Sequence, residues 1–377
     1  MRRALPLCLL LCLSTGCSLF NRVRVDPIAT AYQKPSNVAA YVAVSDADEP
    51  VTGLQPQNFE IYENGQPLSA DDSQLVLLPQ EVATYHHTLL LIDLSGEKAA
   101  DDKLARAAAS FVETLRGTQA ITVYAFDGTS SLRWVADVSK SADTSPVDLR
   151  ALAKMGSGDP SRNLNGALLS GLKELSARLA AQPKVVKVGT LAVFTRGPDL
   201  AGRVTQADIA DVLRETRHDI VAIGIADPAA STLANLGKNG VFEARDEDSL
   251  GVAFENAALR ARALYDRYYL VAYCSPARAG IRHIELQVHF RDTEGDDKAA
   301  NFSQDIDASG FGPGCRADAV PRFLPQLAKQ AARSAKPSAD SKSPPAVPPE
   351  PAPGAAPAPG NDDDSVAPPP KKPGYSH

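Results

Sequence analysis

The chain has 377 residues, a formal net charge of −6 and 22% charged residues. Charges of both signs are mixed through its middle part without a basic stripe, which argues against a nucleic-acid surface. No internal segment reaches the roughly 18 consecutive apolar residues that indicate a membrane-spanning helix. The chain is also too long for one average domain.

The first residues have the pattern of a secretory signal. Two arginines precede an apolar run over residues 5–13, and small residues precede Cys17. This ending resembles a bacterial lipobox, although Leu13 lies one place upstream of the usual large apolar residue. The resemblance implies that residues 1–16 are removed and that Cys17 carries a lipid. An ordinary cleaved signal with an incidental cysteine is the alternative.

Residues 17–37 are polar and irregular, and we interpret them as a lipid-anchored spacer. Residues 38–83 have strand patterns only. Apolar residues alternate from Val38 to Val44, and a second strand runs into the hairpin signal Asn64-Gly65. This segment is too short to bury much of a core alone, so we expect it to pack on another part of the chain.

From residue 84 to residue 265, predicted strands and helices alternate. The run 88–95 is a short apolar strand that ends in Asp93 and Ser95, and similar runs recur at 186–194 and 220–225. This alternation predicts a doubly wound, mainly parallel α/β sheet with helices on both faces. A carboxylate at the carboxyl end of its first strand lies where such sheets form their binding crevice.

Residues 266–316 again show strands without helices, and we expect them to join residues 38–83 in a small β-sandwich. If Cys17 carries lipid and the signal is removed, only Cys274 and Cys315 remain. Two cysteines in an oxidising compartment are expected to form a disulfide. Two buried free thiols are the alternative. Residues 317–377 are rich in Pro and Ala, which predicts a disordered tail.

Asp93-Leu-Ser95 after an apolar strand resembles the start of the Asp-x-Ser-x-Ser motif of von Willebrand factor type A domains. The resemblance covers residues 84–265 and implies an adhesion site at which three loops hold a divalent metal. In this chain Glu97 replaces the second Ser of the motif. Arg162 stands where the second loop has Thr, and Arg196 stands where the third has Asp.

Arginine has no lone pair to offer a metal, and two guanidinium groups would repel a cation. We therefore predict a degenerate site without metal or other cofactor. In it, Arg162 and Arg196 fill the place of the ion and pair with Asp93 and Glu97 through forked hydrogen bonds. The alternatives are arginines that point to solvent, or a metal site that survives with help from Ser161 and Asp199.

Ser95 has no histidine partner for acyl transfer in the sequence pattern, and Gly-x-Ser-x-Gly is absent, so we expect no enzyme. We expect a non-catalytic protein-binding platform of the cell envelope, with an unknown protein ligand and a membrane anchor through the N-terminal lipid. Ser18, rather than Asp, follows Cys17 and favours the outer membrane. The alternatives are a metal-dependent adhesion receptor and a structural component of an envelope complex.

Overall fold

The computed structural model describes residues 23–96, 102–139, 147–184 and 186–319. The predicted signal, Cys17, Glu97 and residues 320–377 of the predicted tail lie outside this part. Within it, the chain forms three sheets: one of six strands, one of five and one of four. None of the helices described is both long and apolar enough to span a membrane.

The six-stranded sheet has the order β12-β11-β10-β7-β8-β9. Five strands are parallel, and the edge strand β9 is antiparallel to β8. The predicted doubly wound, mainly parallel sheet is therefore confirmed. In chain order, the strands are β7 (Thr84–Asp93), β8 (Ala120–Phe126), β9 (Arg133–Val138), β10 (Val186–Thr195), β11 (Asp219–Ile225) and β12 (Val241–Ala244).

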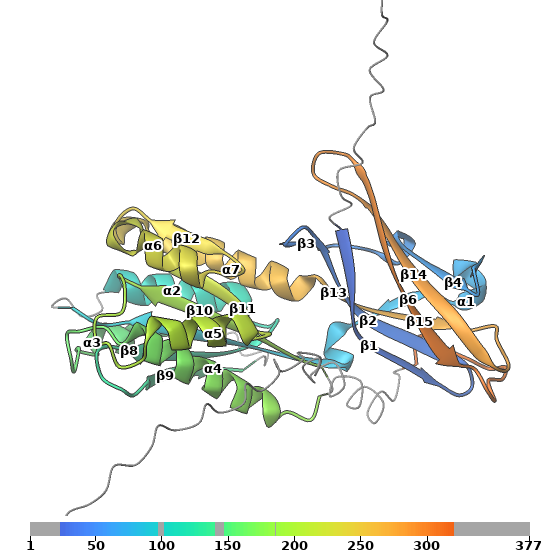
Figure 1. The fold of residues 1–377 in the computed structure, drawn as a ribbon, viewed down its shortest axis with the longest axis horizontal. Coiled ribbons are helices and arrows are strands. Elements are labelled where there is room, and N and C mark those ends of the chain that lie inside the picture. Colours follow the sequence, from blue (N-terminus) through green and yellow to red (C-terminus); the bar gives the residue numbers. More distant parts are fainter. Residues whose placement is uncertain (1–22, 97–101, 140–146, 185, 320–377) are drawn as a thin grey trace, which may run out of the picture. The chain divides into compact units, whose positions relative to one another are not determined.

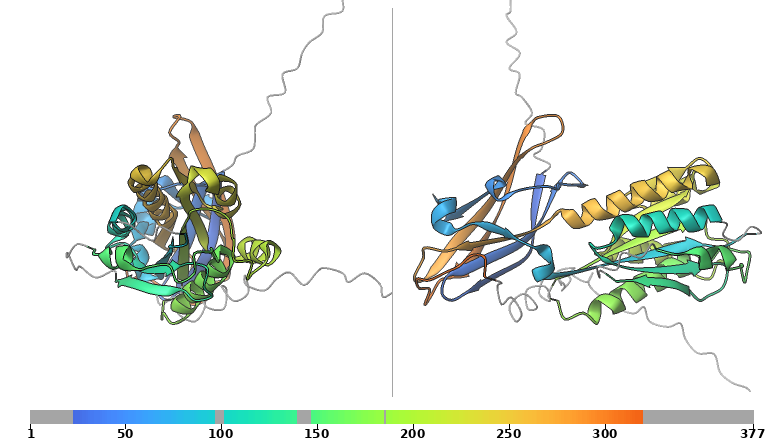
Figure 2. Two further views of the ribbon diagram at one scale, coloured as in Figure 1. Left: turned by 90° about the vertical axis from the view of Figure 1, so that its left-hand side faces the viewer. Right: turned by 180° about the vertical axis from the view of Figure 1, so that it is seen from behind.

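Helices cover both faces of this sheet, as Figures 1 and 2 show from opposite sides. Helices α2 and α7 pack on one face, whereas α4, α5 and α6 pack on the other. The helices of this region are α2 (Asp102–Leu115), α3 (Arg150–Lys154), α4 (Leu164–Ala180), α5 (Gln206–Glu215), α6 (Ala226–Leu236) and α7 (Leu250–Asp266), and a 3-10 turn, η3 (Glu247–Ser249), precedes α7.

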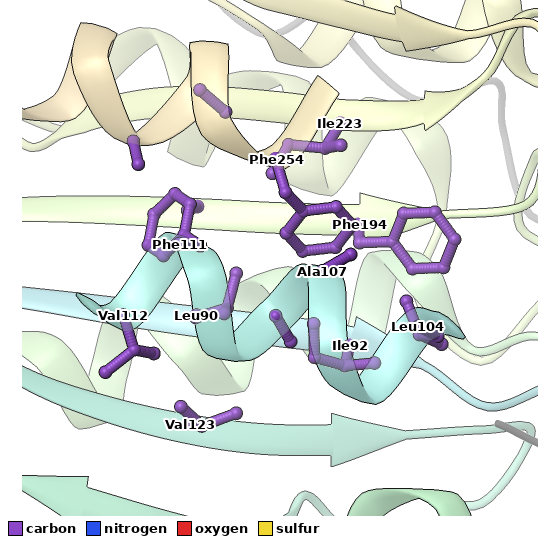
Figure 3. Packing of buried hydrophobic residues seen from close by; sticks show 14 of the residues in the cluster. Leu90, Ile92, Leu104, Ala107, Phe111, Val112, Val123, Phe194, Ile223 and Phe254 are labelled. Carbon is purple, nitrogen blue, oxygen red and sulfur yellow. The ribbon is translucent and has the colours of Figure 1, made fainter. Parts of the chain in front are cut away.

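Strand β7 is buried on both faces, as its sequence predicts. Leu90 and Ile92 face the α2–α7 side, and Leu89 and Leu91 face the α4 side. On the first side, Phe254 of α7 packs against Phe194 of β10, with ring centroids 5.4 Å apart (Figure 3). Aromatic side chains thus fix α7 against the carboxyl-terminal half of the sheet.

The other two sheets are antiparallel and enclose a shared apolar cluster. One has the order β1-β2-β13-β6, with β3 added to β2, and the other has the order β15-β14-β4-β5. Their strands are β1 (Val23–Gln33), β2 (Asn37–Asp46), β3 (Glu49–Pro50), β4 (Phe59–Glu63), β5 (Gln66–Pro67), β6 (Val76–Leu78), β13 (Tyr268–Cys274), β14 (Ile281–Arg291) and β15 (Asp297–Asp307). Three short turns of helix lie between them: η1 (Pro56–Asn58), α1 (Ala70–Ser73) and η2 (Gln80–Val82).

Strands from before and after the α/β region therefore share sheets, as predicted: β2 pairs with β13, and β4 pairs with β14. A disulfide joins Cys274 at the end of β13 to Cys315, with Cα atoms 5.8 Å apart. This is the predicted bridge. The bridge ties the segment that follows β15 to β13, an inner strand of the sheet β1-β2-β13-β6.

Besides the two-residue strand β3, two strands were not predicted. β1 lies within residues 17–37, where the irregular spacer was expected, so that prediction is wrong for residues 23–33. Pro27 and a bulge between Pro27 and Ala29 interrupt the alternation that would reveal this strand. β9 is an edge strand that pairs only with β8, so its positions are half-buried or exposed and it lacks the pattern of a buried strand.

Candidate functional site

The strand order of the six-stranded sheet reverses between β7 and β10, the first and fourth strands of the α/β region. In open α/β sheets, ligands bind outside the carboxyl ends of the strands at such a switch point. β7 ends at Asp93, and its neighbour β10 ends at Thr195. The topology thus places Asp93, Ser95 and Arg196 together at the position where a site is expected.

Asp93 is fully buried, and its carboxylate is surrounded by donors. Oδ1 accepts a hydrogen bond of 2.8 Å from the backbone N–H of Ser95. Oδ2 accepts bonds from Nε of Arg162 at 2.7 Å and from the backbone N–H of Arg196 at 2.9 Å. The hydroxyl of Thr195 lies 3.2 Å from the same oxygen. Both oxygens of this buried carboxylate therefore accept hydrogen bonds from donors of three loops.

Arg162 lies where the resemblance placed it, in the loop before α4. Besides the bond to Asp93, its Nη1 donates to the backbone oxygen of Pro198 at 3.0 Å. Only 11% of its side chain is exposed. The predicted pair with Asp93 is present, but it uses a single guanidinium nitrogen. The forked geometry that we expected is absent, because the second donor turns to the loop that follows β10.

Arg196 is bound differently from the prediction. Its Nη1 donates to the backbone oxygen of Asp93 at 2.9 Å, and its Nη2 lies 3.6 Å from Oε1 of Glu247. The guanidinium also stacks over the ring of Phe194, 5.5 Å from its centroid. The backbone N–H of Arg196 already occupies the carboxylate of Asp93, so the side chain extends toward η3. Glu97, the second of the two carboxylates that were predicted to pair with the arginines, lies outside the described residues.

Ser95 and Asn163 contribute buried polar atoms without partners. Among the described residues, neither the hydroxyl of Ser95 nor the side-chain oxygen of Asn163 has a hydrogen-bond partner. Asn163 uses its amide nitrogen to bind the backbone oxygen of Thr129 at 2.9 Å. These atoms lie on the loops that also carry Asp93 and Arg162.

Ser161 and Asp199, on which the alternative of a surviving metal site depends, are already hydrogen-bonded within the chain. The hydroxyl of Ser161 donates to Oδ1 of Asp159 at 2.7 Å. The two oxygens of Asp199 accept bonds from the backbone N–H groups of Asn165 and Gly202. Oxygen ligands suit a hard divalent cation, but here the carboxylates are occupied by N–H donors. The carboxylates of Asp93, Asp159 and Asp199 at this end of the sheet are thus already bound by donors of the chain itself.

The sequence reasoning missed a second buried carboxylate at this end of the sheet. Asp127 follows β8 and is 1% exposed. It accepts bonds from the backbone and hydroxyl of Thr129, at 2.8 and 2.7 Å, and from the backbone of Gly158 at 2.8 Å. Burial acts to raise the pKa of Asp127, but these bonds and the nearby Arg133 outweigh it, so the pKa lies below 3.8. Its place directly after an apolar strand, like that of Asp93, is the signal that could have found it.

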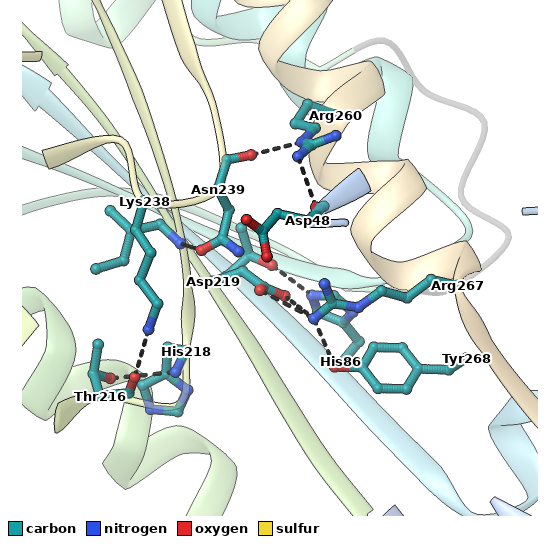
Figure 4. Close-up of polar contacts among 12 residues, drawn as sticks. Asp48, His86, Thr216, His218, Asp219, Lys238, Asn239, Arg260, Arg267 and Tyr268 are labelled. Atoms are coloured by element: carbon teal, nitrogen blue, oxygen red, sulfur yellow. Dashed lines mark hydrogen bonds and ion pairs between the residues drawn. The ribbon is translucent and has the colours of Figure 1, made fainter. Parts of the chain in front are cut away.

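A charged cluster at the amino end of the sheet was also not predicted. Asp219 is the first residue of β11, and Nη2 of Arg267 lies 3.2 and 3.4 Å from its two oxygens (Figure 4). The same nitrogen lies 3.3 Å from the hydroxyl of Tyr268. Burial raises the pKa of Asp219 above 3.8, although Arg267 acts in the opposite direction.

No family model and no curated protein matches this chain. Solved structures similar to it include von Willebrand factor type A domains. One is a von Willebrand factor type A protein from Catenulispora acidiphila, with 13% identity and a TM-score of 0.38 over 76% of this chain and 72% of that chain. The SpRpn10 domain of this type has 10% identity and a TM-score of 0.33 over 45% of this chain and 93% of that chain.

A third similar structure is the manganese-loaded TRAP protein of Plasmodium vivax, with 12% identity and a TM-score of 0.36 over 67% of this chain and 100% of that chain. All three matches have low sequence identity. The doubly wound fold of the present chain is established by its own strand order and hydrogen-bond register.

Proposed function

We propose that this protein is a non-catalytic binding platform for another protein, and that the carboxyl end of the six-stranded sheet is its contact surface. The observation that carries the proposal is the bond of 2.7 Å between Arg162 and Asp93 at the switch point of the sheet. Proteins of this architecture bind their ligands at this place. The residues there provide fixed charges and hydrogen-bond donors.

We propose further that the platform works without a metal. Arg162 and the backbone of Arg196 occupy Oδ2 of Asp93, the oxygen that a cation would need. A guanidinium stays protonated at any physiological pH and offers no lone pair. A divalent ion would have to displace a buried charge pair, and breaking such a pair by removing one partner costs about 3–5 kcal/mol.

Calorimetric titration of the full-length chain with Mg²⁺ and with Mn²⁺ tests this proposal. We expect no saturable binding. The matched positive control is the double variant Arg162→Thr, Arg196→Asp, which restores oxygen ligands at both positions and should gain affinity for Mn²⁺. Micromolar binding to the unmodified chain, lost in Asp93→Ala, would instead support a metal-dependent adhesion receptor.

We propose no catalytic role for Ser95. Its hydroxyl is buried and has no hydrogen-bond partner among the described residues, so no base there is placed to take its proton. The two histidines of β7 bond to threonines of neighbouring strands instead: His86 to Thr190 at 3.0 Å and His87 to Thr122 at 2.9 Å.

We propose that a lipid on Cys17 holds the platform in the cell envelope, at the outer membrane. The test is to express the full-length chain and its Cys17→Ala variant in a bacterial host and to separate the membranes. The unmodified chain should sediment with the membranes, and the variant should not. Equal distribution of the two would contradict the lipid anchor.

A structural part of an envelope complex is the remaining alternative. Cross-linking in intact cells separates it from a platform with an exchangeable ligand. A platform should yield a partner whose recovery changes with variants at the carboxyl end of the sheet. A structural component should yield partners that do not respond to those variants.

A further inference from the structure

The only tryptophan of the sequence lies on the edge strand β9 and faces solvent. This residue, Trp134, is 58% exposed. β9 contains a bulge at Val135, because two successive residues of β8 pair with Ala136 and with Trp134. In a regular strand, residues 134 and 137 would point to opposite faces of the sheet. The extra residue turns Trp134 to the face that carries Asp137.

The indole of Trp134 is held in place by its own polar group. Its Nε1–H donates to Oδ2 of Asp137 at 3.2 Å. Oδ1 of Asp137 accepts from Nη1 of Arg178 at 3.0 Å and from the hydroxyl of Thr122. The indole therefore turns its N–H to the protein and presents apolar ring surface to solvent, where only a ligand can cover it.

Polar side chains of β8 and α4 continue this network. Arg178 of α4 donates from Nε to Oε1 of Glu174 at 2.7 Å and from Nη2 to the hydroxyl of Tyr124 at 3.2 Å. That hydroxyl donates in turn to Oε1 of Glu174 at 3.0 Å. The side chains of Asp137 and Glu174 remain 49% and 36% exposed. Both carboxylates thus keep lone pairs that a ligand can reach.

The charges of this network are already paired. Asp137 and Glu174 share Arg178, and Lys173 is exposed on the same helix, so two negative and two positive charges cancel. His87, which extends the network, is uncharged at neutral pH because burial lowers its pKa to about 4. An ionic ligand would have to separate charges that are already paired. A neutral ligand with hydroxyl groups can bind the open lone pairs without doing so.

Two further cations of the neighbouring strands are bound to other groups. Arg133 donates from Nη1 to the backbone oxygen of Gly156 at 2.7 Å, and its Nη2 lies 3.3 Å from Asp127. Lys187 of β10 donates to the backbone oxygen of Ala180 at 3.0 Å. They therefore do not give the surface around Trp134 an unpaired positive charge.

The bulge also argues against a partner strand at this edge. A regular edge strand can add a strand of another protein through its row of N–H and C=O groups. Val135 interrupts that row, and β9 has only six residues. The free edge is therefore a poor template for a strand, and the exposed ring of Trp134 is left for a ligand of another kind.

We propose that Trp134, with Asp137, Glu174 and Arg178, forms a binding site for a neutral saccharide. A pyranose with equatorial substituents carries C–H groups on its two faces, and these pack on the apolar face of an indole. Its hydroxyl groups extend sideways and donate to the open carboxylate oxygens. The site lies on the flank of the sheet and shares no residue with the site around Asp93, so it goes beyond the proposed function.

Tryptophan fluorescence of the full-length chain tests this site directly, because Trp134 is its only tryptophan. The probes are cellotetraose and chitotetraose, two β-linked tetrasaccharides with equatorial substituents. Sorbitol is the control for a polyol without a ring, and tetralysine is the control for a cation. We expect at least one tetrasaccharide to shift the emission saturably, with a dissociation constant of about 1 mM or lower. The two controls should have no saturable effect.

Electrophoresis through a gel that contains the matching soluble polysaccharide, hydroxyethylcellulose or glycol chitin, measures the same binding in variants without the fluorescent residue. We expect Trp134→Ala to weaken binding by about tenfold or more and Trp134→Phe to retain part of it. Glu174→Gln should weaken binding by about threefold. The matched control is Leu259→Ala on α7, at which a similarly exposed apolar side chain lies outside the network. It should migrate as the unmodified chain does.

The inference is overturned if neither tetrasaccharide changes the emission, if sorbitol or tetralysine acts equally, or if Trp134→Ala matches Leu259→Ala. None of these results bears on the proposed function, which is tested at Asp93 and Arg162 by metal titration and by cross-linking. Conversely, saccharide binding that persists when cross-linking recovers no protein partner would leave this site in place and remove only the protein-binding platform.

Discussion

Two buried aspartate–arginine pairs lie at opposite ends of the same sheet, and their surroundings differ. At the carboxyl end, Asp93 accepts hydrogen bonds from Arg162 and from the backbone N–H groups of two loops. At the amino end, Asp219 is 5% exposed, and the bonds that described residues give its carboxylate come from one nitrogen of Arg267. Both carboxylates are buried, but only the first is surrounded by donors.

The difference lies in where the hydrogen-bond donors come from. The loops after β7 and β10 turn back at the end of the sheet, so their N–H groups are free to point at Asp93. Asp219 begins a strand and relies on a single side chain. Burial disfavours the charged form unless hydrogen bonds compensate for it. Accordingly, the pKa of Asp219 is raised by burial despite the attraction of Arg267.

The largest effect is expected from Arg162→Met, which removes the charge partner of Asp93 and keeps an unbranched apolar side chain. Removing one partner of a buried charge pair costs about 3–5 kcal/mol of unfolding free energy, and the donors that remain on Asp93 are neutral groups or backbone N–H groups. Urea denaturation of the full-length chain measures the change. The control Arg203→Met removes an exposed guanidinium and should stay within about 0.5 kcal/mol. A loss no larger than that of the control would show that the Asp93 pair contributes nothing.

His87 tests burial without any charge pair, on the same strand as Asp93. Burial lowers the pKa of His87 to about 4 from 6.5. The unfolded chain therefore takes up a proton near pH 6.5, whereas the folded chain resists it until about pH 4. Stability should fall as the pH is lowered through this range, by up to about 3 kcal/mol at about 1.4 kcal/mol per pKa unit.

His87→Gln should remove this part of the pH dependence, because glutamine does not titrate. Denaturation of both proteins at several pH values between 4 and 7 measures the difference, so that other carboxylates, which titrate in both proteins, cancel. Parallel stability curves would show that His87 is not responsible.

Arg267→Met should cost less than Arg162→Met, about 1–3 kcal/mol at pH 7. The variant removes the attraction that opposes burial, so the pKa of Asp219 rises further and the carboxylate can escape its unpaired charge by taking a proton. The loss should therefore shrink when denaturation is repeated at pH 5. A loss that is the same at both pH values would contradict this account.

Asp219→Asn is expected to have the smallest effect, within about 1 kcal/mol at neutral pH. The raised pKa of Asp219 means that the folded chain binds the proton more tightly than the unfolded chain. Its contribution is present below pH 3.8 and is lost as the pH rises through the folded pKa. The variant lacks this slope, which is measured by comparing denaturation at pH 3.5 and pH 7.

The sequence predicted one half of the candidate site better than the other. An apolar run buried on both faces places Asp93 at the tip of a strand, and the resemblance brought Arg162 to it; both hold in the structure. The contact of Arg196 with Glu247 was not predicted, because Glu247 lies on a turn before α7 that reaches this place only when the helix packs on the sheet. The sequence near Arg196 gives no sign of its contact with Glu247, because the two residues lie far apart in the chain.

Local periodicity by itself determined which strands are buried on both faces, the alternation that makes a doubly wound sheet, and the position of Asp93 at a strand end. It could do so because apolar residues occupy the buried positions of a strand, so the order of apolar residues along the sequence shows which positions are buried. Only the tertiary structure decided which donors surround each carboxylate. Those donors come from loops and helices distant in the chain, and their approach depends on strand order, which no short stretch of sequence encodes.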